Sequence, residues 1–142
     1  MSKPKTPPRE RSLELKPAAI IAIVDTDVWR VRRLSELLQE CGARVLLLGS
    51  SGNAMQLLPG ARCDVVVVAD GLERPTGSEL CDALREKLGA DRPFFVRLRG
   101  ERGGDASGPV FDETLIEPLV DDALLATLES VVRARRAAVE SA

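Results

Sequence analysis

Short, mostly apolar runs alternate with longer stretches of helical spacing, and this alternation restricts the fold of the chain more than any other feature. The runs predict strands buried on both faces, because they lack the period of two of a half-exposed strand. These runs lie at residues 18–24, 43–49, 64–69, 93–98 and 113–117. Helical spacing of apolar residues occurs at 28–41, 50–58, 77–88 and 119–138. Strands and helices in this order predict an α/β fold: a five-stranded parallel sheet flanked by helices.

The length of 142 residues is sufficient for one domain with a substantial core. Residues 1–17 are rich in proline and positive charge, so we expect a disordered tail before a domain spanning 18–138. Between Leu98 and Glu113 the chain contains several glycines and no apolar periodicity. We therefore expect a loop where a fourth helix would otherwise stand.

Composition argues against several classes of function. The chain has no histidine, so a histidine base or metal ligand is excluded, and its three cysteines have no zinc spacing and are expected to be reduced. We expect no metal, no cofactor and no enzymatic activity. The net charge of −2 and the absence of a long apolar run favour neither nucleic acid nor membrane as a partner, and we expect a cytoplasmic protein.

Three short segments carry a resemblance to a known family. "IVDTD" spans the end of the first strand, "DVVVVAD" precedes "GSEL" at the third strand and its helix, and "LIEPL" spans the end of the fifth strand. In this order and spacing they resemble the receiver domains of bacterial response regulators, over about residues 18–137. The resemblance implies a flavodoxin-like, receiver-type fold. It also implies a pocket in which carboxylates bind Mg²⁺, an aspartate accepts a phosphoryl group, and a lysine and a hydroxyl contact its oxygens.

The chain departs from that pattern at nearly every position of the pocket. An acidic position is kept as Asp25, but its neighbour is Thr26. The phosphoacceptor position is Ala69, with Asp70 one residue later and expected on the opposite face of the strand. In the remaining positions, Leu98 replaces the hydroxyl residue and Glu117 replaces the lysine. Glu117 would bring a second carboxylate near Asp25 without a lysine to offset it, which leaves a weak cation site or a solvent-facing side chain as alternatives.

We interpret the chain as a degenerate (pseudo-receiver) member that cannot be phosphorylated and that binds another protein in bacterial signalling or cell organisation. Two alternatives remain: a receiver phosphorylated on Asp70, and a flavodoxin-like module that binds a small ligand.

The candidate partner-binding residues lie at the start of the first helix. Trp29 falls away from the buried stripe of that helix, and exposed tryptophan is a common interface anchor. Arg30 and Arg33 lie beside it on an expected basic, solvated face.

Overall fold

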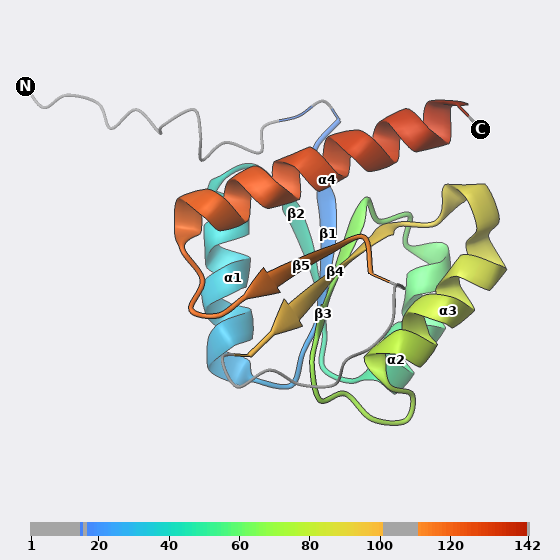
Figure 1. Ribbon diagram of the computed structural model, residues 1–142, viewed down its shortest axis with the longest axis horizontal. Helices are drawn as coiled ribbons and strands as arrows, with labels where there is room; N and C mark the ends of the chain where they lie inside the picture. The colour runs from blue at the N-terminus through green and yellow to red at the C-terminus, as the bar shows by residue number, and fades with distance from the viewer. Residues whose placement is uncertain (1–14, 16, 101–110, 142) are drawn as a thin grey trace, which may run out of the picture.

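Five parallel strands form one sheet in the computed structural model, which describes residues 15, 17–100 and 111–141. The spatial order is β2-β1-β3-β4-β5, so β2 and β5 are the edges (Figure 1). The strands are β1 Ile20–Val24, β2 Arg44–Leu48, β3 Val65–Ala69, β4 Phe94–Arg99 and β5 Glu113–Ile116. The predicted α/β architecture is confirmed.

Four α-helices cover the two faces of this sheet. They are α1 Val28–Glu40, α2 Ser51–Leu57, α3 Gly77–Leu88 and α4 Asp121–Ser141, and single 3-10 turns follow α2 (η2, Leu58–Gly60) and α3 (η3, Gly89–Asp91). Leucines and valines of α1 and α4 share one buried cluster, whereas residues of α2 and α3 belong to another. Helices α1 and α4 therefore lie on one side and α2 and α3 on the other, which gives three layers (Figure 1).

Alternation along the central strands assigns each side chain to one of these clusters. In β3, Val65 and Val67 pack with α1 and α4, whereas Val66 and Val68 pack with α2 and α3. All five residues of β3 are buried. The unbroken apolar run in the sequence thus has a physical cause, because a strand covered on both faces has no position for a solvated side chain.

Some expectations about the chain's organisation fall outside the described residues. The predicted tail lies almost wholly there, and so does most of the segment expected to replace a helix before β5. Helix α4 begins and ends slightly later than its pattern predicted, at Asp121 and Ser141. Among the described residues, no helix has the length and apolar character needed to cross a membrane.

Candidate functional site

The carboxyl ends of the strands bring four of the predicted pocket positions together. Val24 pairs with Val68, so Asp25 and Ala69 follow side by side, and Ala69 itself pairs with Leu98. Continuing the alternation of each strand, these side chains face the layer of α1 and α4, where Leu98 is buried. Glu117 directly follows β5 and donates its backbone N–H to the carbonyl of Arg99. The sequence positions therefore assemble as the resemblance implied.

An arginine from α1 occupies the acidic part of this pocket. Asp27 caps α1 by accepting a hydrogen bond from the backbone N–H of Arg30 at 3.1 Å. This places Arg30 in the first turn, and side chains of a helix lean toward its N-terminus. The guanidinium consequently reaches back to the strand ends rather than out into water, and the expected solvated position of Arg30 is wrong.

Asp25 and Arg30 form a two-point ion pair. Arg30 donates from Nε to Oδ2 of Asp25 at 2.7 Å and from Nη2 to Oδ1 at 2.9 Å. Oδ1 also accepts the backbone N–H of Asp27 at 2.9 Å. Asp25 is only 3% exposed, so a charge-assisted pair of this geometry is what allows the carboxylate to remain buried.

Glu117, which directly follows the edge strand β5, is the second carboxylate that contacts Arg30. Nη1 of Arg30 lies 3.3 Å from each carboxylate oxygen of Glu117. The pKa of Arg30 is raised above its ordinary value, chiefly by its side-chain hydrogen bonds to Asp25, with a further contribution from Glu117. Both alternatives for Glu117 from the sequence require correction, because its carboxylate faces Arg30 rather than an empty cation site or open water.

Asp70 lies in a different environment from Asp25. Arg97 of β4 donates to it from Nε to Oδ1 at 2.7 Å and from Nη2 to Oδ2 at 3.3 Å. Arg97 pairs with Val68, which packs with α2 and α3, and its strand neighbours Val96 and Leu98 pack on the other face, so Arg97 lies on the side of α2 and α3. The side chain of Asp70 therefore lies on the opposite side of the sheet from Asp25, as the alternation predicted.

The remaining positions of the pocket, Thr26, Ala69 and Leu98, supply no further carboxylate. Ala69 and Leu98 are apolar and buried, and Thr26 is exposed. Across the described chain, no group of three histidine, cysteine or acidic residues is arranged to hold a metal ion. The positive charge at the strand ends is supplied by Arg30, a residue that sequence reasoning had assigned to the surface. The signal available beforehand was an arginine three residues after an aspartate helix cap.

The other two candidate partner residues remain at the surface. Trp29 is 76% exposed and its neighbour Val28 is 71% exposed. Arg33 is exposed and pairs with Asp121 at the start of α4, at 2.7 Å between Nη2 and Oδ1. The first turn of α1 thus presents two large apolar side chains beside the acidic pocket.

Comparison with known proteins supports one conclusion about this arrangement. No protein-family model matches the chain, and no curated protein sequence matches it. Solved structures do match. The signal receiver domain of an HD domain-containing protein from Pseudomonas fluorescens Pf-5 aligns with a TM-score of 0.74 at 20% identity, over 87% of this chain and 93% of that one. This chain has the receiver fold.

Further receiver structures agree. The chemotaxis response regulator CheY4 of Vibrio cholerae aligns with a TM-score of 0.69 at 23% identity, over 80% of this chain and 98% of that one. A CheY-like receiver domain protein from Methanospirillum hungatei JF-1 aligns with a TM-score of 0.74 at 17% identity, over 84% and 98%. These likenesses concern the fold, and the chemistry of the pocket has to be argued from the residues present in it.

Proposed function

We propose that this chain is a receiver-like signalling module that is not phosphorylated and that binds another protein constitutively. The observation that carries the proposal is the ion pair between Arg30 and Asp25 in the pocket at the strand ends. A receiver that accepts a phosphoryl group needs a carboxylate to receive it and a cation to neutralise the negative charge of its oxygens. Here Ala69 has no carboxylate to accept the group, and the charge of Asp25 is already neutralised by Arg30 of the same chain.

The geometry also argues against Asp70 as a substitute acceptor. Both of its oxygens are held by Arg97 on the other face of the sheet. To reach the pocket, Asp70 would have to break its ion pair with Arg97, and its side chain would have to move to the other face of the sheet. The residue would then lie beside Leu98, which has no hydroxyl with which to contact a phosphoryl oxygen.

The proposal is tested by adding beryllofluoride with Mg²⁺ and following the backbone amides by NMR. We expect no saturable shifts at Asp25, Ala69 or Glu117. Saturable shifts there would overturn the proposal. Shifts confined to Asp70 and Arg97 would instead favour the alternative phosphoacceptor, and a co-purified small molecule in native mass spectrometry would favour the ligand-binding alternative.

A graded repair of the pocket supplies the matched controls. Ala69→Asp alone is expected to give no response to beryllofluoride, because it adds a third carboxylate to a site where Arg30 is already shared by Asp25 and Glu117. The triple variant Ala69→Asp, Arg30→Ala and Glu117→Lys introduces an acceptor carboxylate, removes the arginine that pairs with Asp25 and supplies a lysine. Any response to beryllofluoride should therefore appear first in the triple variant. Efficient binding by the single variant would show that Arg30 does not block the pocket.

A module that phosphorylation does not switch needs a binding surface that is always available. The first turn of α1 fits this requirement, because Trp29 and Val28 are exposed while Arg30 holds the helix start to the sheet. We propose that a protein partner docks here, in the cytoplasm.

A further inference from the structure

Strand β2 is an edge of the sheet that exposes apolar side chains on both faces. Leu47 is 52% exposed and Leu46 is 37% exposed, and they point to opposite sides of the sheet. Edge strands of monomeric proteins are commonly protected by lysine, proline or a bulge. Between Val45 and Leu48, β2 has none of these and presents only valine and leucine.

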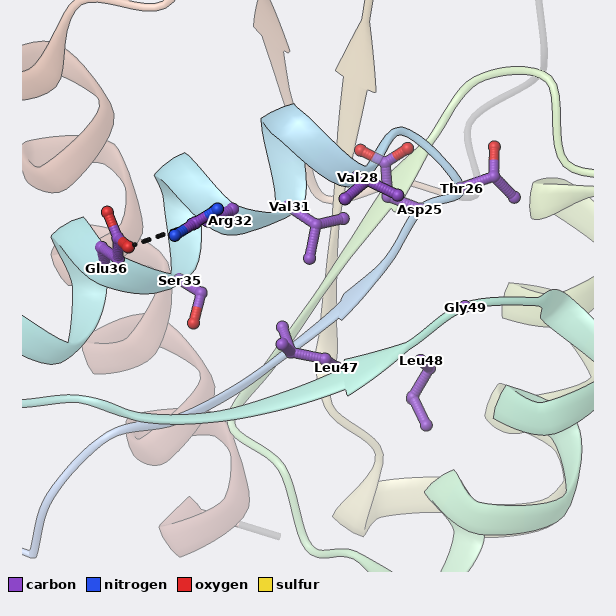
Figure 2. Close-up of a pocket in the computed structure, with 10 residues that line it drawn as sticks. All are labelled: Asp25, Thr26, Val28, Val31, Arg32, Ser35, Glu36, Leu47, Leu48 and Gly49. Carbon is purple, nitrogen blue, oxygen red and sulfur yellow. Dashed lines mark hydrogen bonds and ion pairs between the residues drawn. The ribbon is translucent and has the colours of Figure 1, made fainter.

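A groove runs beside this edge, between α1 and β2. It has a volume of about 550 Å³ and contains the side chains of Val28, Val31 and Leu47. Figure 2 shows Val31 and Leu47 approaching one another across it, and Arg32 paired with Glu36 along α1. The groove is therefore mostly apolar between Val28 and Leu47, with Asp25 and Thr26 also in its lining and Arg32, Ser35 and Glu36 on its helical wall.

The backbone of β2 is directed for pairing with another strand. Arg44 donates its N–H to Ala19 and Leu48 accepts from Asp25, so both point toward β1. Because successive residues of a strand direct their N–H and C=O groups to opposite sides, Leu46 also faces β1, whereas Val45 and Leu47 face outward. The backbone groups of Val45 and Leu47 can therefore pair with those of Leu47 and Val45 in an antiparallel second copy of β2.

The charges of α1 are self-complementary in the same sense. Arg32 in its first half and Glu36 in its second half line the groove, whereas Arg30 is held by Asp25 and Glu117 and Arg33 by Asp121. If two copies of the helix run antiparallel, Arg32 of each lies beside Glu36 of the other. Arg32 and Glu36 line the groove and are one turn apart, so a two-fold axis between them exchanges their positions.

We propose that a second copy of this chain docks on the β2 edge, so that two five-stranded sheets join into one of ten strands. A two-fold axis through Leu46 pairs Val45 of each copy with Leu47 of the other, and these are the residues whose backbone groups face outward. The two Leu46 side chains meet across the axis as a non-hydrogen-bonded pair, at about 4.5 Å between Cα atoms. On the other face, Leu47 fills the seam between the two α1 helices, and Arg32 of each copy faces Glu36 of the other.

The proposal is tested on the full chain by sedimentation velocity over a range of concentrations, together with amide hydrogen exchange. We expect a particle of twice the chain's mass. The amides of Val45 and Leu47 should gain protection as the concentration rises, whereas that of Leu46, already directed toward β1, should not. Leu47→Lys should raise the dissociation constant of the dimer at least about tenfold, because it places a charge twice in the seam. Ile116→Lys, at an exposed position of β5 on the opposite edge of the sheet, is the control and should change it little.

A charge exchange gives a test that does not depend on the apolar contact. Arg32→Glu and Glu36→Arg should each weaken the dimer, and the double variant should restore it. The corresponding exchange of Arg133 and Glu129, a similar pair on α4, should have no effect. A wild-type chain that is monomeric at every concentration overturns the proposal. So does a dimer in which Val45 and Leu47 gain no protection, or one unaffected by Leu47→Lys, and so does capture of β2 by a different protein or by residues 1–14 of the same chain.

Discussion

The most informative single residue is Arg30, because its side chain decides the chemistry of the strand ends. A buried carboxylate without a partner is strongly unfavourable, and among the described residues Asp25 takes its positively charged partner from α1. In a metal-binding pocket the same carboxylate would be available to a divalent cation. The arginine is covalently part of the chain, so this positive charge cannot dissociate.

Replacing Arg30 should destabilise the protein far more than replacing a neighbouring arginine. Arg30→Ala leaves Asp25 buried and unpaired, which we expect to lower the free energy of unfolding by about 3 kcal/mol. Arg33→Ala removes an exposed pair with Asp121 and should cost less than about 1 kcal/mol. Urea denaturation of both variants measures the difference. Equal costs would mean that Arg30 behaves as an ordinary surface residue.

The cysteines should differ sharply in reactivity. Burial is the main reason that the pKa of Cys63 is raised to about 11 and that of Cys81 to about 12. A thiol reacts as its thiolate, which for these two forms only when the pH approaches those values. At pH 8 we expect iodoacetamide to modify Cys41, which is half-buried, and to spare the other two until the protein unfolds. Mass spectrometry of the alkylated peptides identifies which thiols reacted, and rapid labelling of Cys81 in the folded protein would contradict its burial.

At the scale of the elements, three of the described helices that follow a strand begin at a side chain that caps them. Asp27 caps α1, Ser50 caps α2, and Thr76 caps α3 in a reciprocal capping box with Glu79. Helix α3 also begins on a glycine that lies directly over β3. A Cβ atom at Gly77 would lie 2.9 Å from Cγ1 of the buried Val68.

Two glycines at helix starts should therefore respond to alanine in opposite directions. Gly77→Ala forces a shift in the packed layer of Val68, and we expect a loss of about 1–3 kcal/mol of unfolding free energy. Gly52 in α2 has only the hydroxyl of Ser50 near its would-be Cβ, at 4.0 Å. Gly52→Ala should be neutral or stabilising by up to about 1 kcal/mol, because alanine loses less backbone entropy in a helix. Thermal melts of both variants check the signs, and a stabilised Gly77→Ala would show that α3 is not packed this closely.

For the whole molecule, the question is which exposed surface a partner uses. The protein surface at the start of α1 combines exposed apolar side chains with a helix that is held firmly to the sheet. This surface and the β2 edge share Val28, which lines the groove beside β2, whereas Trp29 does not line it and belongs to the first proposal alone.

Trp29→Ala should weaken the complex with the proposed protein partner at least about tenfold, because a tryptophan anchor contributes about 2 kcal/mol or more. The melting temperature should hardly change, since Trp29 is 76% exposed. Quantitative pull-down with wild-type and variant chains identifies the partner, and titration calorimetry then measures the affinity. A loss of several degrees in melting temperature would instead assign Trp29 to the core.

Much of the molecule follows from local pattern. The apolar runs predicted all five strands, and helical spacing predicted the four described helices to within a few residues, because burial patterns act over a few residues. The alignment of Asp25, Ala69, Leu98 and Glu117 also followed, since parallel strands place their carboxyl ends together. Compared with the receiver pattern that the sequence resembles, these residues already placed an alanine at the phosphoacceptor position and a glutamate at the lysine position.

Only the tertiary structure decided where the long charged side chains point. Arg30 could face solvent or the pocket by rotation of its side chain, and the choice depends on two carboxylates, one of them 87 positions away along the chain. The same is true of Arg97, which meets Asp70 only because β3 and β4 are neighbours. Local spacing specifies which face of a strand or helix a residue occupies. The partner of a flexible charged side chain depends on which distant buried charges it must neutralise, and the fold alone brings these together.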